Sequence, residues 1–175
     1  DPERLLVLGE SRQQALAQAM EQLKTEVIPA LKQSQGDFAP GNVRFYEGDD
    51  GVELVLRDIL DSAAKSPQKE YAVISTKTLR EHLYRPFPNF TRQRVSRGIG
   101  VRVIAVGEGG DEAELAERKW LAAPEAADAS YIAIYPPKVA IITLASQNYP
   151  VVIIIDSPAI ASTQQLLFDT LWSLL

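Results

Sequence analysis

The spacing of apolar and polar residues first marks a long helical segment, from about residue 11 to residue 33. The segment is rich in good helix formers, and Ser11 followed by Gln14 has the capping-box spacing. Two heptads leave open whether this helix pairs with a second copy as a coiled coil or packs on its own domain. Pro29 is expected to kink or end it. The apolar residues recur at alternating steps of four and three, a heptad seam: Leu16, Met20, Leu23, Val27 and Ala30.

Residues 41–60 then combine a strand, a glycine-marked turn and an amphipathic helix. The run from Val43 to Tyr46 is β-branched and aromatic, which is typical of a strand. Residues 47–51, Glu-Gly-Asp-Asp-Gly, predict a turn that places acidic side chains at the positive end of the following helix. The apolar positions that fall on one face of that helix are Val52, Val55, Leu56, Ile59 and Leu60.

The remaining pattern predicts a mixed sheet covered by helices. Alternation of strands and helices in the first part predicts parallel strands, and the short links between the last three strands predict hairpins. The expected fold is α/β, a mixed six-stranded sheet flanked by helices, with residues 1–36 as an N-terminal linker or dimerisation helix and residues 37–175 as the α/β domain. Further strands are expected over 71–75, 101–106, 129–135, 138–145 and 151–156, and helices over 76–84, 90–98, 111–121 and from Pro158, capped by Ser157.

Composition narrows the classes of function. A net charge of −5 over 175 residues argues against nucleic-acid binding by this chain alone. The chain has no cysteine and a single histidine, so no disulfide, thiol nucleophile, metal site or cofactor is expected, and a cytoplasmic protein fits best. No apolar run reaches membrane-spanning length, so no membrane partner is expected.

Three stretches together carry a resemblance to a known family. They are Val-Arg-Phe-Tyr-Glu-Gly from Val43, Lys-Val-Ala-Ile-Ile-Thr from Lys138, and a closing Leu-Phe-x-x-Leu-Trp from Leu167. In this order the set resembles the effector domain of TrmB-like transcriptional regulators, which join a winged helix-turn-helix to a domain shaped like one half of a phospholipase D. The winged helix is not part of this chain. The resemblance implies an effector-sensing or dimerisation domain, a homodimer, a possible small-molecule effector, and DNA contact only through the winged helix.

The phospholipase D signature, His-x-Lys-x-x-x-x-Asp, is incomplete here. If Lys138 takes the place of the signature lysine, Pro136 stands where the histidine nucleophile belongs and Thr143 where the aspartate belongs. Ser146-x-Asn148 is similar to the family's downstream Ser-x-Asn but lies too close to Lys138. The chain is therefore expected to be catalytically inactive, and a phosphodiesterase or hydrolase of the phospholipase D type is the alternative.

Candidate ligand-binding residues come from their places at the ends of predicted strands, where α/β sheets open a crevice. Helix capping is an equal explanation for Ser75 and Thr76, and a strand-edge charge is a simpler one for Lys138. His82 is expected to be structural, and Arg92, Arg94 and Arg97 to form a solvated helix face. The candidates for ligand binding are Tyr46, Glu47, Ser75, Thr76, Lys77 and Lys138, and those for dimerisation are Leu16, Met20, Leu23 and Val27.

Overall fold

The computed structural model describes residues 3–30, 42–107, 113–122, 130–145 and 149–175. The chain divides into two units, residues 1–40 and residues 41–175, and each is described here by itself. The domain boundary expected at residue 36 and the pair Ser146 and Asn148 lie outside the described residues.

The first unit is a helix that begins earlier than the sequence pattern indicated. Helix α1 (Glu3–Gln22) runs into a wider turn, η1 (Leu23–Val27), and helical structure continues to residue 30. In η1 the amide of Ile28 donates to the carbonyl of Leu23, five residues back. This wider turn lies directly before Pro29, whose ring crowds the preceding turn and which has no amide hydrogen to donate. The sequence predicted a kink or an end at Pro29, and the described residues show a locally widened turn before it.

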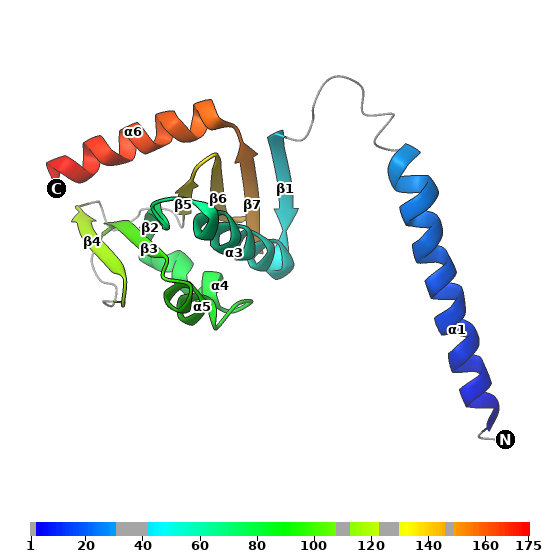
Figure 1. Cartoon of the computed structure of the whole chain (residues 1–175). Helices are drawn as coiled ribbons and strands as arrows, with labels where there is room; N and C mark the ends of the chain where they lie inside the picture. Colours follow the sequence, from blue (N-terminus) through cyan, green and yellow to red (C-terminus); the bar gives the residue numbers. More distant parts are fainter. Residues whose placement is uncertain (1–2, 31–41, 108–112, 123–129, 146–148) are drawn as a thin grey trace. The chain divides into compact units, whose positions relative to one another are not determined.

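The second unit is built on a seven-stranded sheet with the order β1-β7-β6-β5-β2-β3-β4 (Figure 1). Strands β2, β3 and β4 are parallel, and every other neighbouring pair is antiparallel. The expected mixed α/β fold is confirmed, with one strand more than the sequence predicted. The strands are β1 (Val43–Glu47), β2 (Glu70–Thr76), β3 (Gly100–Val106), β4 (Ala116–Leu121), β5 (Ser130–Tyr135), β6 (Lys138–Ala145) and β7 (Tyr149–Asp156).

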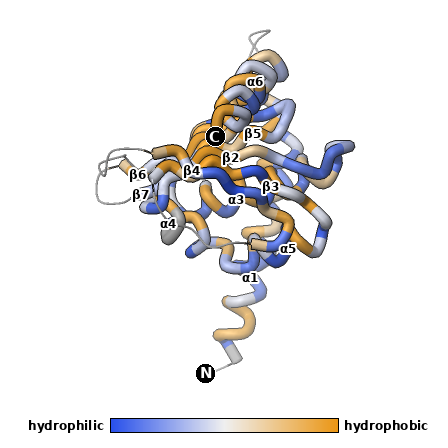
Figure 2. The backbone as a smooth tube through the Cα atoms, turned by 90° about the vertical axis from the view of Figure 1, so that its left-hand side faces the viewer, coloured by the Kyte–Doolittle hydropathy of each residue, from blue (hydrophilic) through white to orange (hydrophobic). Residues whose placement is uncertain are grey.

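Two sequence predictions about the sheet were wrong. The segment predicted as a helix over 111–121 contains strand β4. Its Ala, Glu, Lys and Leu residues favour a helix, but in the structure its side chains point to alternate faces of the sheet. In Figure 2 the charged part of β4 is blue beside mainly orange central strands. Strand β1, expected to join a parallel set, pairs antiparallel with β7 at the edge of the sheet.

Helices cover both faces of the sheet. On one face lie α3 (Gly48–Lys65), η3 (Lys77–Leu79), α4 (Arg80–Tyr84) and α5 (Phe90–Ser96), and on the other lies α6 (Pro158–Leu174) (Figure 1). The predicted apolar face of α3 is buried to between 0% and 1% exposure, as its pattern required. Ser157 caps α6 as predicted, accepting from the amide of Ile160. Within the part of the chain that the structure describes, none of the helices combines the length and apolar character of a membrane span.

The junction between β1 and α3 depends on a glycine. A Cβ atom on Gly51 would lie 2.7 Å from the Cβ of Tyr46, closer than real side-chain atoms approach. Gly51 therefore lets the first turn of α3 pack directly against the end of β1. This contact fixes the helix over the β7 and β1 side of the sheet.

Candidate ligand-binding cavity

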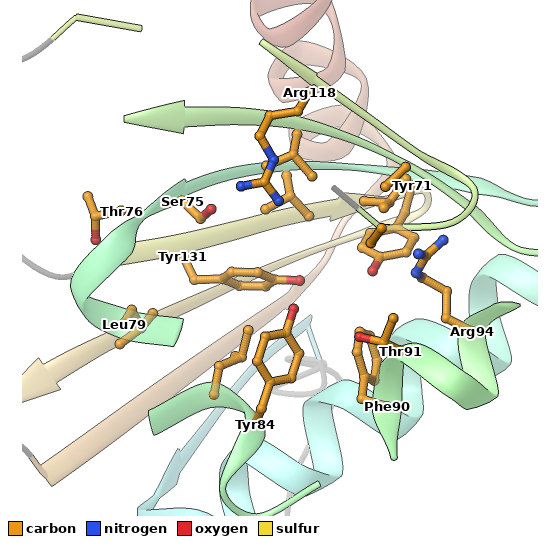
Figure 3. A pocket seen from close by; sticks show the side chains of 16 residues that line it. Tyr71, Ser75, Thr76, Leu79, Tyr84, Phe90, Thr91, Arg94, Arg118 and Tyr131 are labelled. Atoms are coloured by element: carbon orange, nitrogen blue, oxygen red, sulfur yellow. The ribbon is translucent and has the colours of Figure 1, made fainter. Parts of the chain in front are cut away.

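The first candidate site is a cavity of about 460 Å³ between the sheet and the short helices α4 and α5. Strand β2 contributes Tyr71, Val73 and Ser75, which share one face because strand side chains alternate. Figure 3 shows that the side chains around this space come from strands on one side and from helices on the other. The volume falls in the usual range for sites that bind small molecules.

Three tyrosines bring their hydroxyl groups to this cavity. Tyr71 lies on β2, Tyr131 on β5 and Tyr84 at the end of α4, and their hydroxyls face the same space (Figure 3). Burial raises the pKa of Tyr71 and the pKa of Tyr131 well above the ordinary value for tyrosine. Mutual interaction between the hydroxyls raises the pKa of Tyr131 further. Both groups therefore stay protonated and neutral near pH 7, and each can donate a hydrogen bond.

Arg94 forms part of the same wall from α5 and is only 2% exposed. Its Nη1 donates to the carbonyl oxygens of Ile99 and Leu115 at 2.7 and 2.8 Å, and its Nη2 donates to that of Glu114 at 2.6 Å. These bonds hold the residues that directly precede β4 against the end of α5. The solvated face expected for the three arginines is wrong for Arg94, because these carbonyls offer it hydrogen bonds inside the fold.

Two arginines are the charged side chains among the described residues that line the cavity. Arg118 reaches toward the ring of Tyr131 from β4 and is half-buried (Figure 3). Among the described lining residues there is no aspartate or glutamate, and Arg94 has no carboxylate partner among the residues the structure describes.

Two of the six predicted ligand-binding residues line this cavity. Ser75 and Thr76 lie at the carboxyl end of β2, 8% and 5% exposed. The hydroxyl oxygen of Thr76 is 3.0 Å from the amide nitrogen of Ser130 and accepts its hydrogen bond. Thr76 therefore ties β2 to the start of β5. Lys77 follows on η3 with an exposed side chain and is not among the lining residues.

Tyr46 and Glu47 lie at the same end of the strands as Ser75 but far from it. Strand β1 runs in the same direction as β2, yet β7, β6 and β5 lie between them. Four interstrand spacings amount to about 19 Å. Tyr46 packs against the core below α3, and Glu47 lines a different cavity with His82, Arg85 and Tyr149. The predicted residues are thus distributed over separate places and do not form one crevice.

This second cavity contains the only histidine of the sequence. The Nδ1 atom of His82 is buried without a hydrogen-bond partner among the described atoms. Asp49 in the cavity wall is already engaged, because Arg85 donates to both of its oxygens at 2.6 and 3.1 Å. The described residues contain no group of three or more potential metal ligands.

Lys138 lies at the start of β6, at the opposite end of the strands from Ser75. Its Nζ donates to Asp58 Oδ1 at 2.6 Å, and the hydroxyl of Tyr135 donates to Asp58 Oδ2 at 3.0 Å. Lys138 and Asp58 are 17% and 22% exposed at their side chains. Burial and the carboxylate of Asp58 raise the pKa of Tyr135 well above its ordinary value. We call Asp58, Tyr135 and Lys138 the lysine cluster.

Sequence reasoning missed the residues that define the first cavity. Tyr71 and Tyr131 looked like ordinary strand residues, and Arg94 like a surface residue of a short helix. One usable signal was present, because Tyr71, Val73 and Ser75 alternate with apolar residues and Ser75 was already a candidate. The pairing of β2 with β5, which places Tyr131 opposite Ser75, is a long-range contact that no local pattern indicates.

No protein-family model matches the chain, and no curated protein sequence matches it. Among solved structures it is similar to TrmBL2, described as an archaeal chromatin protein, with TM-score 0.47 and 12% identity over 98% of this chain and 68% of that one. It is also similar to Nuc from Salmonella typhimurium, a phospholipase D family member, with TM-score 0.48 and 12% identity over 75% and 93%. With TM-scores below 0.5, these likenesses do not assign the chain to either family.

Proposed function

We propose that residues 41–175 are a small-molecule-binding effector domain without catalytic activity, of the kind found in TrmB-like transcriptional regulators. The observation that carries this proposal is the cavity of about 460 Å³, whose described lining combines three tyrosines, two arginines and an apolar wall. Such a mixture of apolar surface and a few convergent polar groups is typical of small-molecule sites. The sequence resemblance to TrmB-like effector domains supports the regulatory role, and a regulator of this kind would act in the cytoplasm.

The lysine cluster supports the absence of phosphodiesterase activity. Lys138 would have to leave Asp58 before it could hold a phosphate, since the carboxylate already takes its charge. His82 cannot serve as its partner within one chain. Lys138 pairs with Asp156 at one end of the hairpin, whereas Tyr149, beside His82 in the second cavity, pairs at the other end, about 24 Å away along the strand.

The binding proposal is tested with a thermal-shift panel of small metabolites, comparing the wild-type chain with Ala116→Leu. Ala116 lines the cavity, so the larger side chain should fill part of it and abolish the stabilisation by any ligand that binds there. Ala159→Leu is the matched control, because Ala159 is exposed on α6 and outside the cavity. A panel without a single stabilising compound, or stabilisation that survives Ala116→Leu, would count against the proposal.

The enzyme alternative has its own measurement. The chain should not hydrolyse bis-p-nitrophenyl phosphate or a fluorescent phospholipid, with or without divalent metals. Turnover that persists through purification and disappears in Lys138→Ala would replace the proposed function by a phosphodiesterase.

We further propose that α1 and η1 pair two copies of the chain in a homodimer, so that any DNA contact would be made by winged-helix domains held at a fixed spacing. The seam residues Leu16, Met20, Leu23 and Val27 are between 43% and 63% exposed. Apolar side chains in such a row are stabilised when a second helix covers them. Leu23→Glu would place a charge in that seam and should convert the dimer to monomer in light scattering, whereas an unchanged dimer would refute the pairing.

A further inference from the structure

Charged side chains flank the apolar seam of α1 and η1, and their order along the helix differs between its two sides. We infer that this helix pairs with a second copy of the chain in the antiparallel direction, an inference that rests on the homodimer proposed above. All residues from 4 to 30 are exposed in this unit described by itself, which leaves the seam for a second helix to cover.

Two rows of residues, each spaced by seven, lie on either side of the seam. The first row contains Arg12, Ala19 and Glu26, and the second contains Glu10, Ala17 and Lys24. Each row therefore has opposite charges at its two ends and an alanine between them. Charges in the rows beside a helix seam determine which helices pair and in which direction.

In an antiparallel pair each row faces the same row of the second copy, because one helix is turned end over end. Arg12 then faces Glu26 of the second copy, and Glu10 faces Lys24 of the second copy. Both contacts occur twice through the twofold symmetry of a homodimer. Lys24 and Glu26 lie in η1, where the wider turn leaves both side chains exposed. Both rows are thus complementary in charge to themselves when one helix is reversed.

A parallel pair in register brings unlike rows together and loses these contacts. Arg12 then faces Ala17 of the second copy, and Lys24 faces Ala19 of the second copy, so neither charge gains a partner. Within the single chain, the four charged side chains of the two rows form no ion pair with any other described residue. The antiparallel direction therefore pairs charges that the parallel direction leaves in solvent.

The sizes of the seam residues support the same direction. Reversal places Val27 beside Gly9 of the second copy and Leu6 beside Ala30 of the second copy, so a large residue meets a small one in each layer. A Cβ on Gly9 would meet nothing within 4 Å, which leaves room there for a partner side chain. A parallel pair sets Gly9 against Gly9 and leaves a gap, which costs stability. Gln13 alone favours the parallel pair, since two such amides can bond across a seam, and the ion pairs of both rows outweigh this layer.

Spin labels on single cysteines measure the direction, because the sequence contains no native cysteine. Gln18 and Arg4 occupy positions opposite the seam, and the twofold axis of the antiparallel pair passes beside residue 18. Labels at Gln18→Cys should therefore lie level with each other, whereas labels at Arg4→Cys should lie about 42 Å apart along the axis. Double electron–electron resonance on the full chain should give a distance for Arg4→Cys that is longer by at least about 15 Å. Equal distances at the two positions would show a parallel pair and overturn the inference.

Exchange of charges tests the ion pairs independently of the labels. Arg12→Glu and Glu26→Arg should each raise the dissociation constant of the dimer about tenfold at low salt, because each brings like charges together at two symmetric contacts. The double variant should return to within about threefold of the wild type. The two positions lie about 21 Å apart along one helix, so the recovery requires contact between chains. Glu21→Arg is the matched control, since Glu21 is exposed outside both rows, and it should change the constant by less than about twofold. A double variant that dimerises no better than the weaker single variant would overturn the inference.

Failure of this inference and failure of the homodimer give different results. If the wild-type chain is a monomer in light scattering, or if Leu23→Glu leaves a dimer unchanged, pairing through α1 falls and its direction falls with it. If Leu23→Glu dissociates the dimer but the labels at Arg4 and Gln18 give equal distances, the homodimer stands and the antiparallel direction falls.

Discussion

Two polar clusters lie on the same face of the sheet, and they are built differently. In the lysine cluster, the charge of Lys138 is met by Asp58, and Tyr135 donates to the same carboxylate. In the cavity, Arg94 donates to backbone carbonyls, and the described lining offers no carboxylate. In the first cluster two charged side chains pair with each other, whereas in the second a buried guanidinium is held by neutral carbonyls beside open volume.

The difference bears on the role that we propose for each cluster. A lysine that already has a carboxylate partner gains little by exchanging it for a phosphate. Under our proposal the cavity binds the ligand, and the lysine cluster stabilises the fold.

The largest expected effect comes from breaking the cavity wall. Arg94→Met removes the donor of the carbonyls of Ile99 and Glu114 and one of the two donors of Leu115, which also accepts from the amide of Val101. Each carbonyl that is left buried without a donor costs on the order of 1–3 kcal/mol. We expect a loss of about 4 kcal/mol in the free energy of unfolding, measured with urea. Arg92→Met is the control and should change it by less than about 0.5 kcal/mol. A loss in Arg94→Met no greater than that of the control would show that these bonds do not stabilise the wall.

A second effect follows from the raised pKa values of Tyr71, Tyr131 and Tyr135. The folded state keeps these hydroxyls protonated, whereas the unfolded chain releases the protons near pH 10, so their stabilising effect is full below pH 10 and is lost above it. Between pH 10 and 11 we expect about 1 kcal/mol lost per tyrosine, or about 3 kcal/mol together. Urea unfolding at several alkaline pH values measures this loss. A free energy of unfolding that stays constant to pH 11 would contradict the burial of these groups.

A smaller effect should come from breaking the lysine cluster. Asp58→Asn leaves the charge of Lys138 half-buried without its partner, and we expect a loss of about 2 kcal/mol, between the values for exposed and fully buried pairs. Adding Lys138→Met should recover about 1 kcal/mol, because the unpaired charge is then gone. The single change should also lower the pKa of Tyr135, which an absorbance titration at 295 nm can follow. A Lys138→Met change that adds its full cost to that of Asp58→Asn would show that the two side chains are not coupled.

Local patterns predicted the parts of the fold that depend on neighbours in sequence. The buried face of α3, the cap of α6 and the hairpins β5–β6 and β6–β7 all follow from periodicity and short links. Strand β4 was misread because its helix-forming composition outweighed a short alternating pattern. The position of β1 beside β7 depends on a pairing between segments about a hundred residues apart, which no local rule determines.

Only those residues of the candidate site that lie at the end of a strand were predicted from the sequence. Ser75 and Thr76 were found by their position, but Arg94 was not, because its partners are carbonyls of a segment that follows it in the chain. Lys138 was singled out by resemblance, and its pairing with Asp58 on α3 depends on how the helix packs on the sheet. Burial and the pairing of charges are properties of the assembled fold. The sequence alone could therefore identify some of these residues, but not whether they are buried or which partners they have.

The most direct test of the comparison uses ¹⁹F NMR of the chain labelled with 3-fluorotyrosine. The sequence contains six tyrosines, each assignable by one Tyr→Phe variant, and they divide between the two clusters and the β1 side of the sheet. A compound that stabilises the wild-type chain but not Ala116→Leu should shift the signals of Tyr71, Tyr84 and Tyr131 more than that of Tyr135. A shift at Tyr135 with the three cavity signals unchanged would contradict the account and place ligand binding in the lysine cluster.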